Sequence, residues 1–213
     1  SSRRRHTRFK CESSDVCSSD LQDGNFGALG HGIGNGQTKD LLRLSDGRLY
    51  KAQVLGIKKG VRGTPGELEG VVYYGKDNQI GEVSSNTQIG IYGTLTKNFR
   101  EEKKNESLLC PVGYKQEIQT KDAVILSDAS GELQSYRIVI DDLDYTPGDK
   151  NKGIRFHVED ENLLKLTGGI VQGLSGSPIL QDGKLIGAVT HVLVNSPDTG
   201  YGIFIENMLD AAG

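Results

Sequence analysis

From Gly27 onward, short apolar or β-branched segments alternate with glycine and Asx turns, and each segment has the length of a single strand. Turn signals such as Ser45-Asp46-Gly47 and Gln181-Asp182-Gly183 separate the segments, and apolar runs flank the second one as in a hairpin. No amphipathic segments of about 10 to 15 residues lie between them, which favours antiparallel barrels or sandwiches over a doubly wound parallel sheet. The expected strands are Tyr50–Ile57, Glu69–Tyr74, Ile89–Leu95, Ala123–Leu126, Ser135–Ile140, Ile154–Val158, Pro178–Leu180, Leu185–Val194 and Gly202–Ile205.

Helix signals occur in two places. Asp160 precedes a leucine-rich turn at Leu163–Leu166, and Glu206–Ala212 predicts a short C-terminal helix that Gly213 ends. The polar run Lys97–Ser107 divides residues 22–213 into two strand-rich halves of similar size. It is therefore either a linker between two barrels or an exposed loop within one domain.

The first 21 residues differ from the rest of the chain. They hold four arginines, six serines and two of the three cysteines, without apolar periodicity. We expect residues 1–21 to be a non-native or disordered tail on a fragment truncated at its N-terminal side, with a basic binding arm as the alternative. The remaining thiol, Cys110, cannot form an internal disulfide alone and is expected to be a small, partly buried apolar residue.

Composition and charge narrow the possible functions. The 213 residues are 35% hydrophobic and 25% charged, with a formal net charge of −3. No stretch approaches the roughly 18 to 20 apolar residues that span a bilayer, and the N-terminus lacks the apolar core of a secretory signal. The basic residues are mostly scattered, so the sequence predicts neither a membrane segment nor a nucleic-acid partner.

Candidate chemistry begins at Gly173-Leu174-Ser175-Gly176-Ser177-Pro178, a turn of small residues followed at once by an expected strand. Such a turn can expose a serine nucleophile, and the backbone N–H groups of Gly173 and Ser175 are the expected oxyanion donors. A flexible glycine-serine turn without chemistry is the alternative. Because position 177 is serine, the turn departs from Gly-x-Ser-x-Gly, which weakens an α/β-hydrolase interpretation.

A serine nucleophile needs a base, so the turn predicts a histidine elsewhere in the chain. His31 stands between glycines at the end of a short segment, where its ring has room to face a cleft. His157 alternates with apolar residues in an expected strand and is more easily structural. His191, sixteen residues after Ser175, either lines a substrate pocket together with Thr190 or is itself the base.

Four segments together resemble the stage IV sporulation protein B family of serine peptidases: FGALGHGI at 26–33, GTPGELEG at 63–70, LLKLTGGIVQGLSGSPILQDGKLIGAVTHVLVN at 163–195 and TGYGIFIENML at 199–209. The resemblance implies an all-β, chymotrypsin/trypsin-like double β-barrel over residues 22–213, with its halves joined near 97–107 and the active site between them. The family's membrane-spanning segment and PDZ domain have no counterpart here. We expect the first barrel to be incomplete.

The same resemblance implies a serine endopeptidase that works through an acyl-enzyme. Matched onto this chain, the family's catalytic histidine falls at His31, its nucleophile at Ser175 and its acid at Asp160. The implied partners are protein substrates: the chain itself, through self-cleavage, and a membrane-bound regulator of an intramembrane metalloprotease. The implied location is extracytoplasmic, between the two forespore membranes, although this fragment lacks its own signal or anchor. No cofactor and no metal is implied.

The position of Asp160 departs from the usual spacing of a catalytic acid. Asp160 lies only fifteen residues before Ser175, whereas the acid of a two-barrel peptidase usually comes from the first barrel. Its alternative role is to cap the turn at Leu163–Leu166. The other acidic cluster, Asp141, Asp142 and Asp144, is expected to be a solvated strand end rather than a metal site.

Two other classes of function stay open. A barrel of this kind can hold an extended peptide at a strand edge without cutting it, as a non-catalytic peptide-binding module. A serine esterase of unrelated fold is the third possibility, and the lack of helix-length segments disfavours it.

Overall fold

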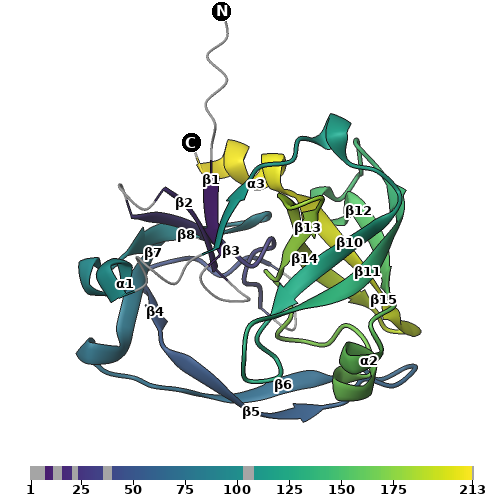
Figure 1. The fold of residues 1–213 in the computed structure, drawn as a ribbon. Helices are drawn as coiled ribbons and strands as arrows, with labels where there is room; N and C mark the ends of the chain where they lie inside the picture. Colours follow the sequence, from purple (N-terminus) through teal and green to yellow (C-terminus); the bar gives the residue numbers. More distant parts are fainter. Residues whose placement is uncertain (1–7, 12–15, 21–23, 36–39, 103–107, 213) are drawn as a thin grey trace, which may run out of the picture.

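The computed structural model describes residues 8–11, 16–20, 24–35, 40–102 and 108–212, whose strands form two large sheets and a separate ribbon (Figure 1). Six strands of the C-terminal half close into an antiparallel barrel in the order β10-β11-β12-β15-β14-β13. Asp182 and Gly183 both adopt positive φ, 52° and 75°, as a two-residue type I′ hairpin requires, which confirms the hairpin predicted there. The barrel strands are β10 (Asp122–Ser127), β11 (Gln134–Leu143), β12 (Ile154–Val158), β13 (Pro178–Gln181), β14 (Lys184–Leu193) and β15 (Ser196–Phe204).

The barrel encloses the main apolar core. Alternate residues of β11 and β12 point inward, and Ile138, Ile140, Ile154 and Phe156 are each at most 1% exposed. Burying a side chain of this size stabilises the fold by about 1.5–3 kcal/mol. The barrel is therefore a well-packed support for β14, the strand on which the candidate site is built.

The N-terminal half forms a seven-stranded sheet in the order β4-β7-β8-β3-β2-β1-β9, with β4 and β9 at its ends in the described part of the chain. A small cluster that includes Phe26 and Ile91 packs on it. Two of its strands, β1 and β2, lie within residues 1–21, which we expected to stay outside the fold. Pairing between backbones needs no particular side chain, so an extended segment readily adds to an unpaired edge; the foreign origin of residues 1–21 stays a prediction. The strands are β1 (Arg8–Cys11), β2 (Val16–Asp20), β3 (Asn25–Ala28), β4 (Gly47–Tyr50), β7 (Gln79–Thr87), β8 (Gly90–Leu95) and β9 (Leu108–Pro111).

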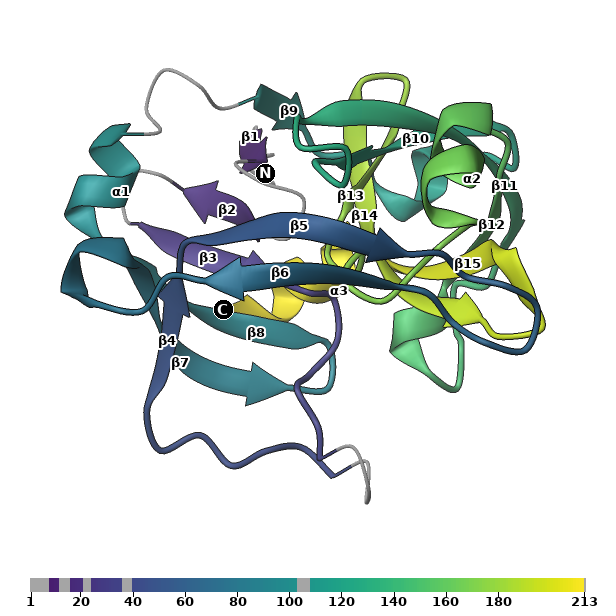
Figure 2. The same cartoon turned by 90° about the horizontal axis from the view of Figure 1, so that it is seen from below.

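Strands β5 (Ala52–Lys58) and β6 (Glu67–Val72) form a two-stranded ribbon that runs from the first sheet to the barrel (Figure 2). Leu68 N donates to Gln172 O, and Gln172 N donates to Gly66 O, both at 2.8 Å. The ribbon is thereby fixed to the segment that leads into Ser175.

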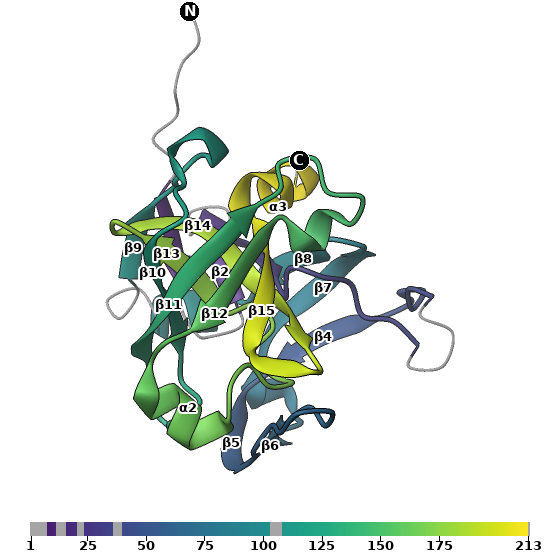
Figure 3. The same cartoon turned by 90° about the vertical axis from the view of Figure 1, so that its right-hand side faces the viewer.

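The helices are short and peripheral. The predicted C-terminal helix is α3 (Ile205–Ala212), and α2 (Glu161–Thr167) follows Asp160, while α1 (Lys97–Glu102) occupies part of the polar run between the two halves. Figures 1 and 3 place α2 and α3 at opposite ends of the barrel. Single 3₁₀ turns are η1 (Lys76–Asn78), η2 (Lys115–Glu117) and η3 (Lys150–Lys152). Within the described ranges, none of the helices has both the length and the apolar character needed to cross a membrane.

Candidate active site

Ser175 lies in a turn that backbone hydrogen bonds hold against β14. Gly176 N donates to Val189 O at 2.8 Å, and Val189 N donates to Ser177 O at 2.9 Å. Gly176 adopts φ 92°, a conformation that glycine accepts without strain, so the chain can reverse directly after the serine. The Ser175 hydroxyl donates to the Thr190 carbonyl at 3.2 Å, and the serine side chain therefore lies against β14.

The turn also offers backbone donors. Among the residues that the structure describes, neither Gly173 N nor Ser175 N has a hydrogen-bond acceptor. Gly173 adopts φ 100°, and a Cβ at this position would come within 3.0 Å of the Leu68 side chain on β6. Two unpaired N–H groups beside the serine are the kind of donor that stabilises an oxyanion.

His31 follows β3 after two residues with positive φ, Leu29 at 68° and Gly30 at 67°. A Cβ on Gly30 would lie 3.0 Å from Thr190 Cγ2, so only glycine lets the chain approach β14 this closely. His31 Nδ1 lies 3.0 Å from Gly32 O. Because a carbonyl only accepts, Nδ1 carries the proton, and in the neutral ring Nε2 keeps the lone pair that a general base uses.

The His31 and His191 ring centroids lie 5.7 Å apart, at an interplanar angle of 47°. Ser175 and His31 therefore contact adjacent residues of β14: the Ser175 hydroxyl bonds to Thr190, and the His31 ring lies beside His191. The hydroxyl of Ser175 points to the Thr190 carbonyl and not to the His31 ring. A serine–histidine hydrogen bond would need a rotation of the Ser175 side chain.

Thr190 and His191 are the two residues predicted to line a substrate pocket, and they face different surroundings. Thr190 is 4% exposed, and its hydroxyl meets the carbonyls of Asn151 at 2.6 Å and Tyr201 at 3.1 Å. The Thr190 hydroxyl is thus used in hydrogen bonds within the protein, while the Thr190 carbonyl accepts the hydrogen bond from Ser175. His191 is half-buried, and its Nδ1 is buried without a hydrogen-bond partner among the described residues.

Burial lowers the pKa of His191 below its usual 6.5. Positive charge on His31 and Lys152 lowers this pKa further, and the carboxylate of Asp149 opposes the change. Lys152 Nζ and Asp149 Oδ2 form an ion pair at 3.2 Å. Burial by itself would raise the pKa of Asp149, but the Asn151 N–H and Lys152 lower it overall. His191 is therefore neutral near pH 7.

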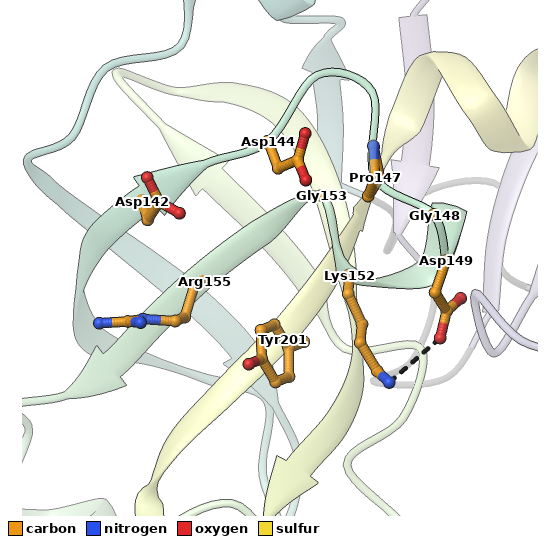
Figure 4. Close-up of a pocket in the computed structure, with 9 residues that line it drawn as sticks. All are labelled: Asp142, Asp144, Pro147, Gly148, Asp149, Lys152, Gly153, Arg155 and Tyr201. Atoms are coloured by element: carbon orange, nitrogen blue, oxygen red, sulfur yellow. Dashed lines mark ion pairs between the residues drawn. The ribbon is translucent and has the colours of Figure 1, made fainter.

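A polar pocket lies beside Tyr201 of β15 (Figure 4). Tyr201 pairs in register with His191 on β14 and with Arg155 on β12. The pocket therefore lies next to the candidate site across the neighbouring strands of the barrel. Carboxylates outnumber cations along its wall, with Asp142, Asp144 and Asp149 against Lys152 and Arg155. It is lined by Asp142, Asp144, Pro147, Gly148, Asp149, Lys152, Gly153, Arg155 and Tyr201.

Asp160 is fully engaged with backbone donors. Its Oδ1 accepts from Asn162 N at 2.9 Å and Leu163 N at 3.1 Å, which makes Asp160 the N-cap of α2. Its Oδ2 accepts from Arg137 N at 3.3 Å. The structure brings Ser175 and His31 to one strand, but it shows no contact between Asp160 and His31.

The remaining candidates lie elsewhere. His157 Nδ1 is 2.7 Å from Asp141 Oδ1, in a partly exposed pair on β11 and β12. No group of three or more histidine, cysteine, aspartate or glutamate side chains is arranged to hold a metal ion in the described part of the chain. Cys110 is 3% exposed within an apolar cluster, as its apolar interpretation predicted.

Sequence reasoning missed the groups that surround the two candidate residues. Two of these groups come from other elements: Leu68 and the Lys152–Asp149 pair. The third is a backbone group, the Gly32 carbonyl. None of these contacts has a sequence signal, apart from the glycines that make the close approaches possible.

A closed barrel beside a second antiparallel sheet, with a serine turn and a histidine at adjacent residues of one strand, is the arrangement expected of a class of protein, the serine peptidases. This chain belongs to the SpoIVB peptidase S55 family, whose model matches residues 16–209. The predictions of the family, of a mostly β fold with a closed barrel and of serine peptidase activity are confirmed. In the described residues the N-terminal half is an open sheet and not a second closed barrel. The family name sets the chain in the context of sporulation.

Comparison with solved structures finds a protease of M. tuberculosis. A crystal structure of the Rv3671c protease in an inactive form has 17% sequence identity and a TM-score of 0.39, and the match covers 66% of this chain and 71% of that one. A serine-to-alanine mutant of Rv3671c from M. tuberculosis H37Rv, also in an inactive form, has 13% identity and a TM-score of 0.40, covering 97% and 86%. Among curated proteins, none matches the chain.

Proposed function

We propose that the chain cleaves peptide bonds through an acyl-enzyme, with Ser175 as nucleophile and His31 as general base. The observation that carries this proposal is that Ser175 and His31, although far apart in the sequence, contact neighbouring residues of one strand, Thr190 and His191 respectively. Nδ1 of His31 is occupied by the Gly32 carbonyl, so Nε2 is the nitrogen left to accept the serine proton.

The proposed reaction starts when the Ser175 hydroxyl leaves the Thr190 carbonyl and turns to His31. His31 accepts its proton as the oxygen attacks the substrate carbonyl, and the N–H groups of Gly173 and Ser175 stabilise the oxyanion. His31 then protonates the leaving amine, and water repeats the cycle on the acyl-enzyme. The role of Asp160 as third member of the triad stays a prediction.

The finer biological assignments rest on the family resemblance. We propose self-cleavage and cleavage of a membrane-bound regulator of an intramembrane metalloprotease as the reactions, and a signalling role in sporulation as their purpose. The proposed place of action is the extracytoplasmic space between the two forespore membranes.

A fluorophosphonate probe tests the chemistry directly, because it labels only an activated serine. We expect labelling at Ser175, and Ser175→Ala or His31→Ala to remove nearly all turnover, on the order of 10⁶-fold, with the double variant little worse than either. Ser177→Ala is the matched control and should keep normal labelling. If Ser177→Ala lost labelling and Ser175→Ala kept it, the nucleophile would be Ser177.

One observation favours a second candidate function. The Ser175 hydroxyl is bonded to a carbonyl and not to His31, as in a turn that binds a peptide without cutting it. A folded protein that binds peptides but is not labelled by fluorophosphonate would support this non-catalytic module.

A further inference from the structure

His191 lies beside the two candidate catalytic residues. It directly follows Thr190, whose carbonyl is 3.2 Å from the Ser175 hydroxyl, and its ring centroid is 5.7 Å from that of His31. A peptide whose carbonyl carbon reaches Ser175 therefore brings a neighbouring side chain within reach of the His191 ring. This step rests on the proposed function, because that function locates the scissile bond.

The hydrogen bonding of His191 fixes which atom can meet the substrate. Nδ1 is buried and has no partner within the described residues. A proton on Nδ1 would leave a buried N–H without an acceptor, which is costly, so the ring proton belongs on Nε2. Nε2 is the ring nitrogen that remains accessible, and it presents a donor that has no partner among the residues the structure describes.

The charges around His191 decide what that donor can bind. The ring is neutral, and in the adjoining pocket Asp142, Asp144 and Asp149 outnumber Lys152 and Arg155. Lys152, a cation that acts on His191, is already paired with Asp149 at 3.2 Å, so a substrate carboxylate would lose water there and meet more carboxylates than cations. An apolar side chain would cover Nε2–H and leave it unpaired. A carboxamide oxygen accepts the hydrogen bond and brings no charge.

We propose that His191 is a specificity-determining residue that selects a glutamine or asparagine side chain next to the scissile bond, by donating a hydrogen bond from Nε2 to the carboxamide oxygen. Aspartate and glutamate, which have similar sizes, are rejected because of their charge. Leucine and methionine are rejected because they offer no acceptor for the Nε2 proton.

The test uses binding, so that it does not depend on turnover. The full chain carrying Ser175→Ala is immobilised, exposed to a random hexapeptide library and washed, and the retained peptides are sequenced by mass spectrometry. We expect glutamine and asparagine to be enriched about tenfold over glutamate, aspartate, leucine and methionine. His191→Phe in the same background should reduce this enrichment to roughly twofold or less, and His191→Gln, which keeps an N–H donor, should restore part of it.

His157→Phe is the matched control, because it removes another histidine from a barrel strand outside the site, and it should leave the enrichment unchanged. Thermal melting shows that each variant is folded. Enrichment of glutamate over glutamine, an enrichment that persists in His191→Phe, or no enrichment at all would overturn the proposal. Fluorophosphonate labelling of protein that retains Ser175 tests the catalytic function separately. Loss of that labelling in His191→Phe would make His191 the base and would also overturn the specificity role.

Discussion

Asp160 offers a sharp test, because its two possible roles predict different numbers. As the N-cap of α2 it accepts hydrogen bonds from Asn162 N and Leu163 N, and it also accepts from Arg137 N. Removing an N-cap side chain typically costs about 0.5–2 kcal/mol. With the third acceptor lost as well, we expect Asp160→Ala to lower the free energy of unfolding by about 1–2 kcal/mol, or roughly 2–8 °C in Tm.

Asp160→Asn separates the two roles. Asparagine caps a helix about as well as aspartate, because its side-chain oxygen still accepts from the first-turn N–H groups. The contacts therefore predict a stability loss within about 0.5 kcal/mol and an unchanged labelling rate. If Asp160 instead orients His31, as the family match implies, the same change should slow the reaction by about 10⁴-fold.

Urea unfolding and the rate of fluorophosphonate labelling check both values on one preparation, with Ser175→Ala as the reference for zero labelling. A labelling rate that falls by about 10³-fold or more in a normally stable Asp160→Asn protein would refute the capping account. It would also require a rearrangement that frees the carboxylate from its backbone donors.

Three further predictions follow from the local geometry. Gly173→Ala should lower the labelling rate by about 10²-fold or more, because it strains φ and brings a Cβ against Leu68. The control is Gly131→Ala, at φ 94° with open space around it, which should lose similar stability and keep its labelling rate. Because the pKa of His191 is lowered in the folded state, the unfolded chain binds more protons than the folded one as the pH falls below 6.5, and the protein loses stability. The free energy of unfolding should therefore fall less between pH 7 and pH 5 in His191→Phe than in the unchanged protein. Burial raises the pKa of Tyr92 to about 12, so stability should fall above about pH 10 as the unfolded tyrosine ionises, and absorbance titration of Tyr92→Phe should lack one late step.

The sequence predicted elements best where the local pattern was strong. Strand β12 has the predicted bounds, because its alternation matches a strand with one face in the core. The turn after Asp160 forms as a capped helix for the same local reasons. Strand β7 was missed, since the polar run Gln79–Thr87 lacks alternation and forms a strand through pairing with β4 and β8.

Other misses show where a local signal was overlooked or did not exist. Helix α1 lies in the run predicted as a connector, and Thr96 Oγ1, which accepts from Phe99 N at 3.4 Å, supplies a capping signal that can be read in the sequence. At the candidate site, glycines and the serine turn predicted the chemistry. The hydrogen bond from His31 Nδ1 to the Gly32 carbonyl depends on backbone geometry. The charges that act on His191 come from His31, Lys152 and Asp149, all distant from it in the sequence.

The hydrogen bond between Ser175 and the Thr190 carbonyl has a limited effect on the choice between peptidase and binding module. A hydrogen bond of this kind contributes about 0.5–1.5 kcal/mol, so it favours the observed side-chain rotamer by roughly tenfold at most. A new hydrogen bond to His31 Nε2 would offset the same amount when the side chain rotates. The free-energy difference between the two rotamers of Ser175 is therefore small compared with the 10⁶-fold effect expected of the catalytic pair. What decides the function is whether Nε2 of His31 lies within reach of the rotated hydroxyl, and the close approach of Gly30 to β14 is the feature that holds His31 beside it.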